Sequence, residues 1–152
     1  MRLKLDVQVA STQPNLPATP TIKHWAKTAL AERVEKTIAL GVRLVDDVES
    51  AQLNQRYRQK TGATNVLSFP CDPLPHITTC FLGDLVICAP VVQAEARAQN
   101  KPETAHWAHM VIHGILHLCG YDHIDDHDAS IMEAKEANIL ERLGFNDPYS
   151  AD

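Results

Sequence analysis

The chain has 152 residues, of which 45% are hydrophobic and 22% are charged, a composition typical of globular proteins. No apolar run approaches the roughly 18 residues that a membrane helix needs, and residues 1–10 contain no signal-peptide core. We therefore expect a cytoplasmic protein with no membrane partner, built as a single domain over residues 1–152.

The net charge of −5 gives no overall indication of nucleic-acid binding, but the charge is unevenly distributed. Residues 1–60 carry ten Lys and Arg against six Asp and Glu, a net +4, whereas residues 61–152 carry four against thirteen, a net −9. Affinity for phosphate would thus have to come from a local patch, for which residues 56–60 are the candidate, and from a bound metal ion. The four cysteines form no C-x-x-C pair, so we expect free thiols rather than a zinc knuckle or a redox motif.

The first half of the chain alternates strands and helices. Apolar and polar residues alternate near the N-terminus, which predicts a half-buried strand, and a proline-rich loop follows. In the second expected strand, Gly41 weakens the pattern or marks a bulge. The expected elements are a strand at Leu3–Val9, a helix from Thr21, a strand at 36–45, and a helix capped by Asp46 and Asp47 that runs through Tyr57.

The second half begins with two short apolar strands and ends with three helices. Pro90 suits the first position of a helix, and an acidic cluster complements the dipole at the start of the last one. We expect the apolar face of that last helix to comprise Ile131, Ala134, Ile139 and Leu143. The expected elements are strands at Val66–Phe69 and Phe81–Cys88, a loop at 72–76, and helices from Pro90 to about residue 100, at Glu103–Cys119 and at Asp125–Leu143. The pattern predicts an α+β fold, with helices packed on a small mixed sheet of about four strands.

Three histidines with the spacing H-x3-H-x5-H form the strongest chemical signal. His113 and His117 are four residues apart, on one face of a helix, and Gly120 stands where that helix would end. A turn there can bring His123 back as a third ligand. Three protein ligands leave a tetrahedral zinc ion one open position, as in catalytic sites. The spacing therefore predicts one Zn²⁺ per chain in a zincin-like site, although nitrogen ligands also suit nickel, copper and iron.

The same spacing resembles the metzincin signature H-E-x-x-H-x-x-G-x-x-H, with one departure. Where those proteases have a glutamate as general base, this chain has Gly114. The motif therefore favours zinc strongly and peptide hydrolysis weakly.

Other residues near this motif have ordinary interpretations as well as functional ones. His106 and His109 lie on the same helical face as the two predicted ligands, and we favour a supporting role for them, as for His127 beyond the turn. Cys119 is expected to pack as a small apolar side chain and Met132 to fill the core. Asp122 could orient a histidine or cap the next helix, and Ser68 could bond a phosphate or only its own turn.

The segment from His113 to His123 resembles the H-G-x-L-H-L-x-G-Y-D-H signature of the YbeY family of bacterial endoribonucleases and rRNA maturation factors. Further blocks match in the family's order and extend the resemblance to about two thirds of the chain. They are Asn54 with Tyr57-Arg58, the T-N-V-L-S-F-P block at 64–70, the G-D-L-V-I block at 83–87, and the G-F-N-D-P-Y tail at 144–149.

This resemblance implies a metal-dependent endoribonuclease that prefers single strands and acts on rRNA and ribosomal particles, in 16S 3′ end maturation and ribosome quality control. It also implies that Arg58 is catalytic. A guanidinium can bridge the phosphoryl oxygens on which negative charge develops during phosphodiester cleavage. Two alternatives remain open: a metzincin-type metalloprotease, and a non-catalytic ribosome-associated factor that zinc stabilises. The sequence assigns no proton acceptor and no oligomeric state.

Overall fold

Four strands form one mixed sheet with the order β1-β2-β4-β3 in this computed structural model, which describes residues 1–75 and 77–150. Strands β1, β2 and β4 are parallel, and the edge strand β3 is antiparallel to β4. The strands are β1 (Arg2–Val9), β2 (Thr37–Val45), β3 (Val66–Pro70) and β4 (Thr79–Cys88). The helices are α1 (Thr19–Ala29), α2 (Asp47–Arg58), α3 (Ala89–Ala98), α4 (Glu103–Leu118) and α5 (Asp126–Arg142). The predicted α+β fold is confirmed, and the predicted loop at 72–76 includes His76, which lies outside the described residues.

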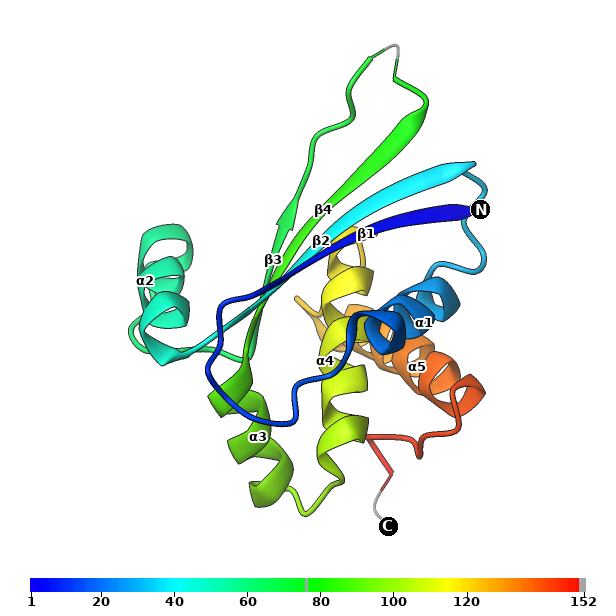
Figure 1. Cartoon of the computed structure of the whole chain (residues 1–152). Helices are drawn as coiled ribbons and strands as arrows, with labels where there is room; N and C mark the ends of the chain where they lie inside the picture. Colours follow the sequence, from blue (N-terminus) through cyan, green and yellow to red (C-terminus); the bar gives the residue numbers. More distant parts are fainter. Residues whose placement is uncertain (76, 151–152) are drawn as a thin grey trace.

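Apolar residues are buried on both faces of the sheet. On one face, under α1, α4 and α5, the main core contains every second residue of β2, including Ile38, Leu40 and Val42 (Figure 1). The other face carries a smaller cluster that includes Leu67 and Val86, against which Leu53 of α2 packs. Helix α2 is therefore attached to the sheet on the side opposite α4. None of the helices in the described ranges is long and apolar enough to cross a membrane.

Helix α4 approaches the sheet closely because it has no side chain at Gly114. A Cβ built there would lie 2.7 Å from Cδ2 of Leu85 and 3.1 Å from Cγ2 of Val66. The hydroxyl of Ser68 on β3 donates a hydrogen bond of 3.2 Å to the carbonyl of Gly114. Position 114, where metzincins have the glutamate, faces Leu85 and Val66 of the sheet. Gly114 therefore sets the distance between α4 and the sheet.

The irregularity of the sheet lies on β4 and not at Gly41, where the sequence suggested it. The register passes from Ala39 opposite Phe81 to Leu40 opposite Gly83, so Leu82 is the extra residue. Gly83 has φ +141°, and a side chain there would overlap the carbonyl of Phe69. Gly41 is in register, and its missing side chain leaves room for the carboxylate of Asp84.

Two sequence expectations about helices are wrong in detail. Asp46 is the first flanking residue of α2, but its side chain makes no capping bond to that helix. Its carboxylate instead accepts hydrogen bonds from Ser11 and Thr12, which ties the loop after β1 to the start of α2. On α5, Ile131 and Ala134 are exposed. The buried side of α5 carries Met132, Glu136, Ile139 and Leu140.

The close approach at Gly114 predicts a loss of stability in Gly114→Ala. Alanine improves helix propensity by about 1 kcal/mol, but overpacking a core costs about 1–3 kcal/mol. We expect a net loss of about 1 kcal/mol, measured by urea unfolding of the metal-free protein. A variant that is more stable than the wild type would show that Gly114 does not set the distance between helix and sheet.

Candidate metal and phosphate site

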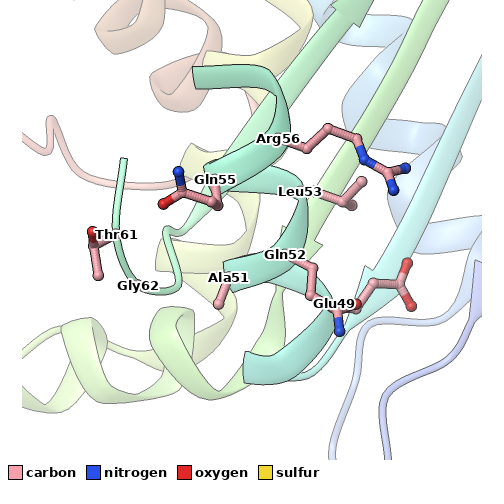
Figure 2. A pocket seen from close by; sticks show the side chains of 8 residues that line it. All are labelled: Glu49, Ala51, Gln52, Leu53, Gln55, Arg56, Thr61 and Gly62. Atoms are coloured by element: carbon pink, nitrogen blue, oxygen red, sulfur yellow. The ribbon is translucent and has the colours of Figure 1, made fainter. Parts of the chain in front are cut away.

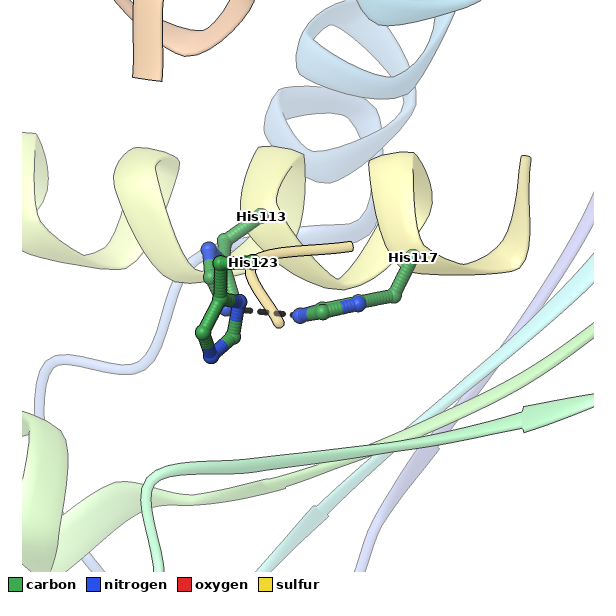
Figure 3. A group of neighbouring side chains, drawn as sticks. All are labelled: His113, His117 and His123. Carbon is green, nitrogen blue, oxygen red and sulfur yellow. Dashed lines mark hydrogen bonds between the residues drawn. The ribbon is translucent and has the colours of Figure 1, made fainter. Parts of the chain in front are cut away.

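The three predicted histidines lie together at the C-terminal end of α4. His113 and His117 project from successive turns of the helix, and His123 returns from the segment that follows (Figure 3). One ring nitrogen from each lies within 4.8 Å of the other two. Nε2 of His117 is 3.1 Å from Nε2 of His113, so these two nitrogens face the same point. Three nitrogen donors this close can share one metal ion while leaving a coordination position open.

The turn that returns His123 has the geometry predicted for Gly120. The Gly120 N–H donates to the carbonyl of His117, and the Tyr121 N–H donates to the carbonyl of Leu116, each at 3.0 Å. Gly120 has φ +99°, a conformation that L side chains rarely adopt. This pair of bonds around a glycine is the Schellman ending of a helix, and it reverses the chain toward the site.

Arg58 and the three histidines line one cleft of about 740 Å³. Its other walls come from Tyr57 of α2, from Asn65 and β3, including Ser68 and Phe69, and from Asp122 beside the turn. The cleft therefore joins the last turn of α2, an edge strand and the end of α4, segments that lie far apart in the sequence. A phosphate lying between the histidines and the guanidinium would contact both.

The neighbouring arginine of the basic patch belongs to a different surface. Arg56 lines a separate hollow of about 850 Å³ with residues of α2 and the turn at Thr61 and Gly62 (Figure 2). No histidine of the described part of the chain lines that hollow. Of the two arginines on this turn of α2, Arg58 is the one that shares a cleft with the histidines.

Several contacts hold the end of α2 beside the cleft. The rings of Tyr57 and Phe69 meet edge to face at 5.1 Å, which links the last turn of α2 to β3. Asn54 is buried, and its amide donates a hydrogen bond of 2.9 Å to the carbonyl of Gly62. Gln59 ends the helix in the left-handed region, with φ 52°. These contacts position the backbone of Arg58 while its side chain remains exposed.

Behind the histidines lies a carboxylate that the sequence analysis missed. Glu136 of α5 is 1% exposed, and its Oε1 is 3.0 Å from Nδ1 of His113. Its Oε2 contacts Nε2 of His109 and accepts a hydrogen bond of 2.8 Å from the hydroxyl of Tyr149. Buried charges require such partners. The sequence did contain a signal for this residue. Glu136 lies four residues after Met132 and four before Leu140, so it lies on the same face of the helix as two apolar residues.

The electrostatics of the site favour an ionised Glu136 and a neutral His117. Burial alone would raise the pKa of Glu136, but the hydrogen bonds with His109 and His113 outweigh it and lower that pKa to about 2. Burial, with repulsion from His113 and His123, lowers the pKa of His117. A neutral imidazole keeps the lone pair that binds a metal.

The remaining candidates have structural roles. Ser68 bonds the backbone of α4 rather than its own turn. Asp122 accepts a hydrogen bond of 2.8 Å from the backbone N–H of His123, and the residue that caps α5 is Asp125. Cys119 packs against the main core and Met132 is buried within it, as expected.

The other histidines fall into two classes. His106 and His109 are buried, and each contacts a glutamate, Glu95 in the first case and Glu136 in the second. His109 and His113 also form, with Glu136, a second group whose ligand atoms lie within 4.8 Å of one another. His127 is exposed on α5 and belongs to neither group of potential ligands found in the described part of the chain.

Comparison with known proteins decides the family. Residues 7–144 match the family model described as Endoribonuclease YbeY. A relative named Endoribonuclease YbeY, from Cellvibrio japonicus, is 49% identical over 148 residues, which cover 97% of this chain and 84% of that protein. The chain belongs to the YbeY endoribonuclease family. The resemblance inferred from the histidine motif is therefore confirmed. The family is named for endoribonuclease activity, that is, hydrolysis of RNA at internal positions.

The fold agrees with this assignment to YbeY. The solution structure of TM1509 from Thermotoga maritima superposes with a TM-score of 0.63 at 25% sequence identity. The match covers 95% of this chain and 99% of that one.

The depressed pKa of Glu136 predicts a specific dependence of stability on pH. A carboxyl whose folded pKa is about 2 rather than 4.5 adds stability above pH 4.5, and that contribution is lost as the pH falls toward 2. In metal-free protein, the difference in unfolding free energy between wild type and Glu136→Gln should shrink by roughly 2 kcal/mol from pH 6 to pH 3. Urea titrations at several pH values measure this difference. A constant difference would show that the carboxylate is not held in its charged form.

Proposed function

We propose that this chain is a zinc-dependent endoribonuclease that cuts single-stranded RNA. In this proposal His113, His117 and His123 bind one zinc ion, and Arg58 binds the phosphate to be cleaved. The observation that carries it is the single cleft that Arg58 shares with the three histidines, in a chain that belongs to an endoribonuclease family.

The donor set suits zinc. Three imidazole nitrogens converge, and Cys119 is not among the potential ligands in the described residues. Three protein ligands are the number found at catalytic zinc sites, where the fourth position is open to water or substrate. A bound zinc ion would supply Lewis acidity to a phosphoryl oxygen or a water molecule.

Arg58 supplies a permanent positive charge, which neutral imidazoles cannot. Its guanidinium is a permanent cation with a planar set of donors that can bind two phosphoryl oxygens at once. The side chain is exposed at the cleft wall, so it can meet RNA that enters from solvent. Negative charge on the phosphoryl oxygens grows as the bond breaks, and Arg58 would stabilise that charge.

The preference for single strands is supported by aromatic side chains in the cleft wall. Tyr57 and Phe69 line the same cleft as the histidines, and Tyr57 is 56% exposed. Exposed rings beside a cationic group are typical of surfaces on which unpaired bases stack. A base next to the bound phosphate could pack on this pair.

The biological setting that we propose is maturation of the 16S rRNA 3′ end and ribosome quality control, on ribosomal particles in the cytoplasm. Membership of an endoribonuclease family supports an RNA substrate. The metalloprotease alternative lacks the general base that metzincins have at the position of Gly114. Position 114 faces Leu85 and Val66 in the core, so a glutamate there would meet these side chains. In the non-catalytic alternative the zinc ion would be structural, and activity would not follow zinc occupancy.

Zinc content tests the ligands. Purified wild type should hold about one zinc ion per chain, and His117→Ala should lose most of it because two imidazoles bind far more weakly than three. Elemental analysis after dialysis against a weak chelator measures the content. His127→Ala is the matched control, since it removes an exposed histidine outside the group and should keep the wild-type content. Full occupancy after replacement of all three site histidines would contradict the proposal.

Cleavage of RNA tests Arg58. Arg58→Ala should keep its zinc and lose about 10²–10³ in cleavage rate, since removal of one donor to a developing oxyanion costs about 2.7–4 kcal/mol. Arg58→Lys should recover only part of the rate, because an ammonium keeps the charge and loses the planar fork. Single-turnover cleavage of a labelled single-stranded oligonucleotide measures these rates.

Arg56→Ala provides the control, because it removes the same charge from the same helix turn but from the separate hollow. We expect its rate to stay within a few-fold of the wild type. Equal losses in the two alanine variants would indicate general attraction of RNA by positive charge. Zinc-dependent cutting of casein, with RNA cleavage unaffected by Arg58→Ala, would favour the protease.

A further inference from the structure

We propose that Glu136 is the positioning residue of the metal centre, that it orients His113, and that His109 and Tyr149 hold it in place. This inference rests on the proposed function, because it requires His113 to be a metal ligand. No part of the histidine motif contains Glu136, which comes from the following helix.

The two ring nitrogens of His113 face opposite partners. Nδ1 lies 3.0 Å from Oε1 of Glu136, whereas Nε2 lies 3.1 Å from Nε2 of His117. A carboxylate can only accept, so Nδ1 of His113 must carry the hydrogen. The neutral ring then has its lone pair on Nε2, directed at the point shared by the three histidines. The contact with Glu136 thus selects both the tautomer and the orientation that a metal ligand needs.

Glu136 is itself held from the other side. Its second oxygen contacts Nε2 of His109 on α4 and the hydroxyl of Tyr149 in the segment after α5. Nε2 of His109 is also 3.2 Å from that hydroxyl. Both carboxylate oxygens therefore have partners, and the side chain is fixed between α4 and the C-terminal segment. A displacement of Glu136 would break these contacts, so His113 is oriented by a rigid group.

The arrangement is asymmetric among the three histidines. Within residues 1–75 and 77–150, His113 is the only one of the three whose ring lies within hydrogen-bond distance of a carboxylate. His123 lies on the exposed segment after the turn. His113 is therefore the fixed ligand around which the other two assemble.

The group formed by His109, His113 and Glu136 has the ligand types of a second metal site. Its atoms already satisfy one another, since each Glu136 oxygen has an imidazole partner and one also has the Tyr149 hydroxyl. These contacts hold the group together without an ion, although Nδ1 of His109 is buried with no hydrogen-bond partner among the described residues. The number of zinc ions bound per chain separates a positioning carboxylate from a second metal site.

Zinc affinity of metal-stripped protein, measured by competition with a chromophoric chelator, tests the role of Glu136. Glu136→Gln should bind zinc about 10–100-fold more weakly, the usual effect of losing a carboxylate behind a ligating histidine. Tyr149→Phe should weaken binding in the same direction but by less than tenfold, since it removes one bond to Glu136. The visible absorption of the cobalt-substituted protein should also change in Glu136→Gln, because the ligand field depends on the orientation of His113.

Glu95→Gln is the matched control. Glu95 contacts His106 on the same helix, also at 3.0 Å, and neither residue belongs to the three-histidine group. Glu95→Gln should leave zinc affinity unchanged. An equal loss in Glu95→Gln and Glu136→Gln would overturn the positioning role, because the effect would then be general destabilisation. The positioning role would also be overturned if the wild type binds two zinc ions and Glu136→Gln binds one, because Glu136 would then be a metal ligand.

His117→Ala separates this inference from the proposed function. If His117→Ala loses zinc while Glu136→Gln keeps wild-type affinity, the positioning role is wrong and the ligand set stands. If His117→Ala also keeps zinc, the ligand set is wrong. Should Glu136→Gln fail to fold, Tyr149→Phe decides, and an unchanged affinity and cobalt spectrum in that variant would overturn the inference.

Discussion

The close contact between α4 and the sheet at Gly114 is the constraint on which the site depends. Because no side chain separates the helix from Leu85 and Val66, α4 lies directly against β3 and β4. Ser68 reinforces the contact through its bond to the carbonyl of Gly114. Two successive turns of α4 can therefore present His113 and His117 to a cleft whose opposite wall is the edge strand. A larger residue at this position would move both histidines relative to that strand.

The two chemical parts of the site reach the cleft from opposite faces of the sheet. Helix α4 and the main core lie on one face, and α2 packs on the smaller cluster of the other face. The edge strand β3 lies between them, and residues of this strand line the cleft that Arg58 shares with the histidines. The relative position of metal ligands and phosphate-binding cation thus depends on the sheet, which is rigid compared with a loop.

Local patterns in the sequence predicted much of this structure. The spacing of the histidines and the helix-ending Gly120 were sufficient to predict that the three rings meet, because one helix and one turn determine that geometry. The strands and helices followed from their periodicity. Arg58 required the family resemblance, since nothing local distinguishes it from Arg56.

The features that the sequence missed depend on contacts between distant elements. Glu136 resembles an ordinary charged residue of an amphipathic helix, and only the approach of α4 shows that it is buried against His109 and His113. The predicted apolar face of the same helix was right for Ile139 and Leu143, which pack in or against the main core, and wrong for Ile131 and Ala134, which are exposed. The bulge at Leu82 likewise depends on the pairing of β4 with β2, which periodicity within one strand does not reveal.

The position of a phosphate relative to the metal and to Arg58 is the most direct test of the site. It can be measured in a crystal of the zinc-loaded protein with a single-stranded oligonucleotide whose 2′-hydroxyls are methylated, so that cleavage by attack of the adjacent 2′-oxygen is blocked. We expect one phosphoryl oxygen about 2.0–2.2 Å from a zinc ion bound by His113, His117 and His123, and hydrogen bonds from the Arg58 guanidinium to that same phosphate. A zinc ion closed off by four protein side chains, or RNA bound with its phosphates away from this cleft, would contradict the proposed site.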